Sequence, residues 1–336
     1  MELKEKVIDQ MNKMGAERTP FLFVFDFALK EPFILPLHAV NNQQIRYSMD
    51  DDFLEYRNYH NPESSASVEL QLQKEPISFS TFESAFGLVH RHLQKGNSFL
   101  TNLTAETPIK ANWQAEQLFL RAKAKYKLFV KDRFFCFSPE TFVQIKASGQ
   151  ISSFPMKGTI DAHFPDAENI ILSDRKEKYE HTTIVDLIRN DLSKIANKVW
   201  VERFRYIEKI KKQDGTELLQ VSSEVCGQLP ENWQEKIGDL FFELLPAGSI
   251  SGAPKPKTLE IINEAEKITL YNGERGFYTG VYGVFDGEKL NSAVMIRFVE
   301  LRNGEMFFKS GGGITSRSSA DSEYKEMISK IYVPVL

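Results

Sequence analysis

The feature that most constrains the fold is a succession of short apolar runs rich in Phe and Val, with few helix-like stretches between them. Early runs of this kind are residues 21–27 (FLFVFDF) and 33–37 (FILPL). Later ones are residues 280–285 (GVYGVF), 293–301 (AVMIRFVEL) and 305–310 (EMFFKS). Aromatic and β-branched residues in runs of this length are typical of strands. Neighbouring strand runs favour an α+β protein with large, mainly antiparallel sheets.

The remaining elements follow from the spacing of apolar residues. We expect further strands at residues 98–106, 124–130, 134–138 and 141–145. Helical spacing predicts helices at residues 81–95, 173–196, 257–266 and 318–331. Ser173 or Asp174 can cap the longest of them. We also expect one compact domain over residues 76–336, with residues 1–75 as a shortened, less regular lobe.

Composition excludes several classes of function. Lys and Arg total 42 against 46 for Asp and Glu, a net charge of −4, so the chain lacks the basic excess that neutralises nucleic-acid phosphates. No stretch approaches the roughly 18 to 20 apolar residues of a membrane span, and the N-terminus lacks the apolar core of a signal peptide. Cys136 and Cys226 lie far apart, which suits a reducing compartment. We therefore expect a cytoplasmic protein that binds neither membrane nor nucleic acid.

Two pairs of glutamates stand three residues apart on two of the expected helices. Glu177 and Glu180 share a face with the apolar residues that follow them, and Glu323 and Glu326 repeat this pattern. Carboxylates on an inward-facing stripe are costly unless they are paired or bind a metal ion. Each pair alone can be explained by a nearby lysine or by the helix dipole. Together the two pairs could hold a hard dication such as Mg²⁺, which prefers oxygen ligands.

Three further features each have a chemical and a purely structural explanation. The glycines at 311–313 follow a strand run, where their N–H groups can cradle an anion or form a tight turn. Lys157 lies among apolar and small residues, either as a surface side chain or as a desolvated amine. Arg297 lies within the expected strand 293–301, where an inward position would require an anionic partner.

Seven motifs, in order along the chain, resemble those of the chorismate-utilising enzymes, which include anthranilate, aminodeoxychorismate, isochorismate and salicylate synthases. The motifs are SPETF (138–142), PMKGT (155–159), KEKYEHTTIVDLIRNDL (176–192), PAGSISGAPK (246–255), the IR pair within 293–301, SGGGI (310–314) and EYKEMISK (323–330). The resemblance covers about residues 80–334. It implies an α+β fold with large, mainly antiparallel sheets sandwiched around the active site and helices outside.

The resemblance also implies roles for particular residues. Glu140 corresponds to the general acid that protonates the departing C4 hydroxyl group of chorismate, and Lys157 to a nucleophile that attacks C2. Glu180 and Glu326 correspond to magnesium ligands, and Glu177 and Glu323 to direct or water-mediated supports of the ion. The positions associated with substrate binding are Gly158, Thr159, Ser249, Arg297, Gly311, Gly312, Gly313 and Lys330.

Two positions distinguish the branches of this family. Lys157 matches the lysine of aminodeoxychorismate synthases, where anthranilate synthases carry alanine. Leu100 stands where isochorismate and salicylate synthases place a lysine that activates water. The resemblance therefore implies Mg²⁺-dependent amination of chorismate at C4 to 4-amino-4-deoxychorismate, for p-aminobenzoate and folate synthesis.

The source of ammonia and two alternatives complete the sequence-based hypothesis. The chain has no G-x-C-x-G glutaminase elbow, so ammonia would come from a separate glutamine amidotransferase subunit or from solution. One alternative is amination at C2 with loss of pyruvate, as in anthranilate synthase component I. The other is a non-catalytic, chorismate-binding scaffold subunit. Gln220 stands where the family often has a histidine linked to the pyruvate step, which favours a product that retains pyruvate.

Overall fold

The computed structural model describes residues 3–50, 52–60, 69–211 and 216–335 of the protein. The helices in these ranges are α1 (Leu3–Ala16), α2 (Phe79–Gln94), α3 (Ala115–Arg121), α4 (Ala167–Ser173), α5 (Arg175–Leu192), α6 (Ile237–Leu244), α7 (Lys255–Ala265) and α8 (Ala320–Ser329). Among the described residues, every helix is too short or too polar to span a bilayer.

The first strands along the chain are β1 (Phe21–Phe25), β2 (Phe33–Pro36), β3 (Ile45–Met49), β4 (Tyr56–Arg57), β5 (Leu72–Lys74), β6 (Leu100–Ala111), β7 (Tyr126–Val130), β8 (Phe134–Ser138) and β9 (Thr141–Ile145). The later strands are β10 (Gln150–Ser153), β11 (Met156–Asp161), β12 (Lys198–Lys211), β13 (Glu217–Gln228), β14 (Gly252–Ala253), β15 (Val281–Phe285), β16 (Leu290–Val294), β17 (Phe298–Arg302) and β18 (Glu305–Ile314). The predicted strands 134–138 and 141–145 are confirmed with the same bounds.

These strands form two nine-stranded sheets. The first has the order β11-β13-β10-β9-β16-β15-β1-β2, with β12 paired to β13. The second has the order β14-β6-β18-β17-β8-β7-β3-β4, with β5 paired to β6. Long pairs such as β12 with β13 and β6 with β18 are antiparallel. The predicted α+β fold with large, mainly antiparallel sheets is confirmed.

The chain divides into two compact units, each assembled from three separate segments. The first contains Met1–Phe21, Thr141–Ser249 and Val284–Ser292; the second contains Leu22–Glu140, Ile250–Gly283 and Ala293–Leu336. The expected lobe at 1–75, of which residues 1–2, 51 and 61–68 lie outside the described part, is not one of these units. Its strands pair with later ones instead, β3 with β7 and β5 with β6. Non-local strand pairing, rather than chain order, therefore sets the division.

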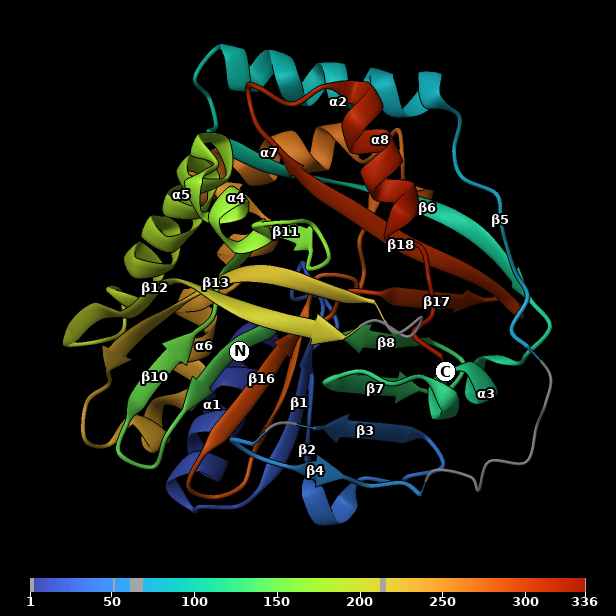
Figure 1. Ribbon diagram of the computed structural model, residues 1–336. Coiled ribbons are helices and arrows are strands. Elements are labelled where there is room, and N and C mark those ends of the chain that lie inside the picture. The colour runs from blue at the N-terminus through green and yellow to red at the C-terminus, as the bar shows by residue number, and fades with distance from the viewer. Residues whose placement is uncertain (1–2, 51, 61–68, 212–215, 336) are drawn as a thin grey trace. The chain divides into compact units, whose positions relative to one another are not determined.

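In the first unit, α4 and α5 pack on β11 and β13, and α1 packs on α6 (Figure 1). The helix predicted at 173–196 is α5, and α4, which was not predicted, ends just before it, because Asp174 has an extended backbone between the two. Asp174, one of the two caps that the sequence allows, is the N-cap of α5, and its carboxylate accepts a hydrogen bond from the Glu177 N–H at 2.9 Å. This cap fixes where the helix that carries Glu177 and Glu180 begins.

In the second unit, α2, α7 and α8 pack against β6 and β18 (Figure 1). The apolar stripe of α2, including Phe82 and Val89, is buried there together with Phe308 of β18 and Met327 of α8. Burial of each such side chain contributes about 1.5–3 kcal/mol. This contact holds α8, with its two glutamates, over the strand β18.

The strand predicted at 293–301 is divided between the two sheets. Its first part is β16 and its second part is β17, and Arg297 lies in the break between them with a φ of 51°. A left-handed backbone cannot continue an extended strand, so the chain turns there. The prediction that Arg297 lies in mid-strand is therefore wrong.

Candidate functional site

A lysine and a glycine of β11 meet two glutamates of α5 in the first unit. We call Lys157, Gly158, Glu177 and Glu180 the α5 cluster. The Nζ of Lys157 lies 3.0 Å from Oε2 of Glu180, with side chains that are 33% and 12% exposed. Lys176, one turn earlier on the helix, lies 3.9 Å from the other oxygen of Glu180. Because Glu180 is almost enclosed, the Lys157 pair is less screened than an ordinary surface ion pair.

Glu177 is the member of this cluster with an unsatisfied atom. Its Oε2 is buried and has no hydrogen-bond partner in the described part of the chain. Burial raises the pKa of the Glu177 carboxyl, against the opposite effect of the Lys157 charge. A Cβ at residue 158 would lie 2.9 Å from this same oxygen, and the φ of 94° at this position favours glycine. A buried carboxylate oxygen without a partner indicates room for a cation or a donor.

A β-bulge places Lys157 beside α5. β11 pairs with β13 at Met156↔Ser222 and at Thr159↔Gln220, so two residues of β11 face one residue of β13. Gly158, within the bulge, has a φ of 94°, which glycine adopts without strain. Bulges of this kind turn a side chain out of the regular alternation of a strand. Here the turned side chain is the amine that pairs with Glu180.

The second unit contains a cluster of matching composition. We call Gly312, Glu323, Glu326 and Lys330 the α8 cluster. The Nζ of Lys330 lies 2.8 Å from Oε1 of Glu326 and donates to the carbonyl oxygen of Gly311, also at 2.8 Å. A Cβ at residue 312 would lie 3.4 Å from Oε2 of Glu323 and 3.6 Å from Oε1 of Glu326. The helix therefore brings both carboxylates close to the backbone of β18.

The glycines at 311–313 lie inside β18 rather than in a turn after it. They pair in register with residues 102–104 of β6. The tight turn that the sequence left open is therefore excluded. A Cβ at Gly311 would lie 2.3 Å from the carbonyl oxygen of Leu103, and one at Gly313 would lie 2.9 Å from Cδ1 of Leu100. Glycine is required here for close approach and not for an unusual backbone angle.

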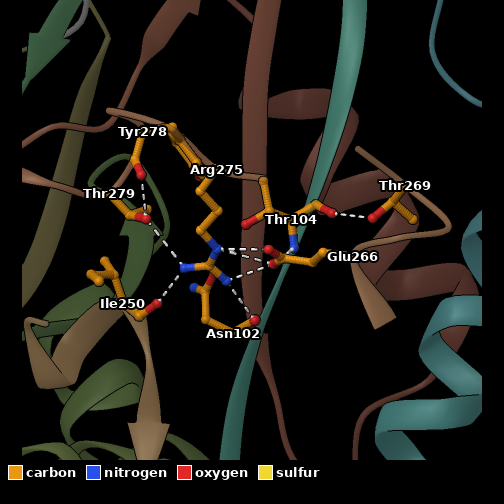
Figure 2. A network of polar contacts seen from close by, with 8 residues as sticks. All are labelled: Asn102, Thr104, Ile250, Glu266, Thr269, Arg275, Tyr278 and Thr279. Atoms are coloured by element: carbon orange, nitrogen blue, oxygen red, sulfur yellow. Dashed lines mark hydrogen bonds and ion pairs between the residues drawn. The ribbon is translucent and has the colours of Figure 1, made fainter. Parts of the chain in front are cut away.

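A buried ion pair between Arg275 and Glu266 contacts β6, as Figure 2 shows. Nη2 of Arg275 lies 2.6 Å from Oε1 of Glu266, and both side chains are 1% exposed. Arg275 also donates to the carbonyl oxygens of Asn102 at 2.9 Å and Ile250 at 2.8 Å. Glu266 accepts a hydrogen bond from the Thr104 N–H at 2.9 Å. Since both charges are hydrogen-bonded to β6, breaking the pair would leave an uncompensated buried charge and displace this strand.

Glu140 and Arg297 also belong to the second unit. The Glu140 N–H donates to the Ser138 hydroxyl at 3.1 Å, just after β8. The Arg297 guanidinium lies over the ring of Tyr332 at 5.2 Å, and its buried Nε–H donates a hydrogen bond to no described residue. Burial raises the pKa of Tyr278 to about 12, and the charges of Arg297 and Glu140 also act on this hydroxyl.

The remaining predicted residues lie in the first unit, outside the α5 cluster. Thr159 pairs in register with Gln220 of β13. Ser249 lies in a short 3₁₀ turn, Gly248–Ile250. The structure thus groups four predicted residues in each cluster. The roles that the sequence assigns to all these residues remain predictions.

The two clusters differ from a complete metal centre. No three Asp, Glu, His or Cys side chains within the described ranges are close enough together to hold a metal ion. Each cluster contains two carboxylates with a lysine ammonium beside the second. Oxygen-only donors suit Mg²⁺, and the unsatisfied oxygen of Glu177 fits an additional cation. The residues present therefore fit the predicted magnesium ligands.

Sequence reasoning did not single out His181, which directly follows Glu180. Its imidazole is buried, with Nε2 2.7 Å from the Ser223 hydroxyl and Nδ1 3.4 Å from the Lys157 carbonyl oxygen. Burial lowers the pKa of this imidazole. The only signal in the sequence is its position next to a candidate ligand, and its partners come from strands far away in the chain.

A family described as chorismate binding enzyme matches residues 19–335. The chain is 49% identical over 328 residues to an "Uncharacterized PabA-like protein" of Haemophilus influenzae, covering 98% of this chain and 96% of that one. It is 28% identical over 272 residues to aminodeoxychorismate synthase component 1 of Bacillus subtilis, covering 76% and 55%. The crystal structure of anthranilate synthase component I from Streptococcus pneumoniae matches with a TM-score of 0.65 and 25% identity, covering 80% and 60%.

Proposed function

Since the chain belongs to the family of chorismate binding enzymes, we propose that it aminates chorismate at C4 to give 4-amino-4-deoxychorismate. The reaction uses Mg²⁺ and ammonia from a separate glutaminase subunit, and its product leads to p-aminobenzoate and folate. The observation that carries the proposal is the position of Lys157. Its amine lies on a β-bulge, 3.0 Å from Glu180, in a cluster of acids. This is the arrangement that a lysine nucleophile needs to be oriented.

The proposed first step is loss of the Lys157 ammonium proton to water, followed by attack of the neutral amine on C2 of chorismate. The new N–C bond forms as the ring double bonds shift, and the C4 hydroxyl leaves as water with a proton from Glu140. Ammonia then adds at C4, the double bonds shift back, and the bond from C2 to Lys157 breaks. The adduct of ammonia returns one proton to Glu140, so the acid is regenerated.

The acids of the two clusters are the proposed ligands of Mg²⁺. They are Glu177, Glu180, Glu323 and Glu326. When bound, the ion supplies positive charge that binds the ring carboxylate and makes the ring more electrophilic. The buried, unsatisfied oxygen of Glu177 supports this assignment. The proposed contacts for substrate carboxylates are Lys330 and Arg297. The Nε of Arg297, like Oε2 of Glu177, has no partner among the described residues.

The second candidate is amination at C2 with loss of pyruvate, which the resemblance to anthranilate synthases implies; the Streptococcus pneumoniae relative carries that enzyme name. Lys157 favours the C4 reaction because C2 amination by ammonia leaves the lysine without a role. A third reaction, addition of water at C2, needs a base beside the glycines of β18. The side chain there is Leu100, whose Cδ1 would lie 2.9 Å from a Cβ at Gly313. Leucine cannot accept a proton, so water addition is disfavoured.

The test is to identify the product of the purified chain with chorismate, Mg²⁺ and ammonium. We expect 4-amino-4-deoxychorismate by mass and chromatography, and p-aminobenzoate when a 4-amino-4-deoxychorismate lyase is added. Lys157→Ala should lower this product by at least about 10³-fold. Lys176→Ala is the matched control, because Lys176 is a more exposed lysine 3.9 Å from the same glutamate. Anthranilate as the wild-type product, or full activity of Lys157→Ala, would contradict the proposal.

The source of ammonia is tested by replacing ammonium with glutamine. We expect no product from the chain and glutamine alone, and restored product when a glutamine amidotransferase subunit is added. Turnover with glutamine and the purified chain alone would contradict the need for a partner.

A further inference from the structure

We propose that His181 and Ser223 are positioning residues that hold the backbone of Lys157, so that its amine stays beside Glu180. The inference rests on the proposed function, in which Lys157 is the nucleophile. Glu180 and His181 are consecutive residues of α5, and they contact the two ends of Lys157. Glu180 pairs with the amine at 3.0 Å, and Nδ1 of His181 lies 3.4 Å from the carbonyl oxygen.

The hydrogen bonds around His181 form a chain in which each group donates to the next, from the Arg205 N–H to the Lys157 carbonyl oxygen. The Arg205 N–H donates to the Ser223 hydroxyl at 2.9 Å, and this hydroxyl lies 2.7 Å from Nε2 of His181. A carbonyl oxygen only accepts, so we assign the ring hydrogen to Nδ1, which faces Lys157. Nε2 of the neutral ring then accepts from the Ser223 hydroxyl. The short bond to Ser223 fixes the ring, and the fixed ring presents Nδ1 to the Lys157 carbonyl.

The bulge explains why Lys157 needs such support. Lys157 and Gly158 together face one residue of β13, so the regular ladder is interrupted at this point. Gly158, with a φ of 94°, adds no stiffness of its own. A contact from the neighbouring helix therefore limits the positions that the Lys157 backbone can take.

The imidazole ring of His181 is enclosed, and both of its nitrogens are used in the contacts with Lys157 and Ser223. His181 is 1% exposed and Ser223 is fully buried. The ring of Phe204 covers the imidazole edge-to-face, with centroids 6.0 Å apart. The Arg205 guanidinium donates to the carbonyl oxygen of Leu172, in α4, at 2.7 Å. His181 is thus placed to act through Lys157 rather than on a substrate.

The first experiment measures steady-state kinetics of three variants. His181→Ala should lower kcat about 10- to 100-fold while KM for chorismate stays within about 2-fold, because the nucleophile is misplaced but the binding groups remain. His181→Asn should recover most of kcat, since the asparagine amide can donate in place of Nδ1. Ser223→Ala should lower kcat about 5-fold, the equivalent of one lost hydrogen bond.

The second experiment measures the reactivity of Lys157 without substrate, metal or ammonia. Trace acetic anhydride reacts with neutral amines, and mass spectrometry of the Lys157 peptide gives the labelling rate. In His181→Ala we expect this rate to rise about 5-fold, because a released backbone lets the amine leave Glu180. Lys127 and Lys309, which are 4% and 3% exposed, serve as internal controls, and their labelling rates should not change.

Two matched variants control for the loss of a histidine or of a buried hydroxyl. His163→Asn changes an exposed histidine of the same unit that pairs with Asp161. Ser152→Ala removes a buried hydroxyl of the same sheet, which lies 3.3 Å from Cys226 Sγ. Both should leave kcat and Lys157 labelling unchanged.

Three results would overturn the inference. They are wild-type labelling of Lys157 in His181→Ala, a parallel rise at Lys127 and Lys309, which indicates general loosening, and a raised KM with unchanged kcat. If His181→Ala does not fold, the Lys157 labelling rate is measured in Ser223→Ala and His181→Asn instead. A wild-type chain that makes no C4-aminated product but shows His181-dependent labelling of Lys157 supports the positioning role and removes only the proposed function.

Discussion

The α5 cluster and the α8 cluster are built to the same plan from segments far apart in the sequence. In each, two glutamates stand three residues apart near the start or middle of a helix. A lysine pairs with the second glutamate, at 3.0 Å for Lys157 with Glu180 and 2.8 Å for Lys330 with Glu326. A strand glycine lies against the first glutamate, Gly158 in one cluster and Gly312 in the other.

The clusters differ in enclosure and in the origin of the lysine. The Glu180 side chain is 12% exposed and that of Glu326 is 48% exposed. Lys330 follows Glu326 by one turn of the same helix, so their pair is a local one. Lys157 comes from a bulged strand and meets Glu180 only through the fold. The comparison teaches that one carboxylate spacing can be built into an enclosed ion pair made by the fold at α5 and into a more open, local ion pair at α8.

The largest effects are expected from removing the second glutamate of each cluster. Glu180→Gln and Glu326→Gln should each lower Mg²⁺-dependent kcat/KM by about 10³-fold, because each removes a proposed ligand. Only Glu180→Gln should also raise the labelling rate of Lys157. The measurement is a Mg²⁺ titration of activity together with amine labelling. If Glu326→Gln leaves the Mg²⁺ dependence of activity unchanged, the proposal that the α8 cluster binds Mg²⁺ is contradicted.

The two glycines should respond unequally to alanine. Gly158→Ala places a Cβ 2.9 Å from Glu177 Oε2 at a φ of 94°, so we expect kcat to fall about 10²-fold. At residue 312 the nearest atom would be 3.4 Å away and the backbone is ordinary strand, so Gly312→Ala should cost only about 3-fold. Steady-state kinetics check this order. Equal losses would show that the bulge at Lys157 has no special role.

The lysine of the α8 cluster should affect binding more than turnover. Lys330→Met should raise KM for chorismate about 10-fold and change kcat by less than about 3-fold, because it removes a cation proposed to bind a carboxylate. Lys325→Met is the control on the same helix, where Lys325 pairs with Asp321 and is 73% exposed. A fall in kcat as large as that of Lys157→Ala would make the two lysines equivalent and break the comparison.

The smallest effect is one of stability and concerns Glu177. Burial raises the pKa of its carboxyl in the folded state, so its favourable contribution is complete below the unfolded pKa, near 4.5, and is lost as pH rises through the folded pKa. Without Mg²⁺ at pH 7, Glu177→Gln should therefore raise the free energy of unfolding by about 0.5 kcal/mol. Glu326→Gln, at an exposed position, should change it by less. Urea unfolding at pH 7 and pH 4 checks this, and an equal gain at both pH values would contradict it.

Much of the candidate site could be predicted because its signals are local. The glutamate spacing, the Asp174 cap and the strands that flank Glu140 all follow from a few neighbouring residues. Other elements were missed for identifiable reasons. Helix α1 has Val7, Met11 and Met14 buried at helical spacing, a signal that the charged residues between them obscure. The long β12–β13 pair carries many charges along β12, which weakens the apolar alternation that marks a strand.

The sequence by itself determined where the long helix begins, which helix positions carry paired carboxylates, and which motifs relate the chain to its family. Only the tertiary structure decided that Lys157 pairs with Glu180, that the glycines lie inside β18, and that the chain turns at Arg297. The physical reason is the range of the interactions. Caps and helix spacing act within about one turn of chain, whereas a bulge, a strand register and a buried ion pair join segments that only folding brings together.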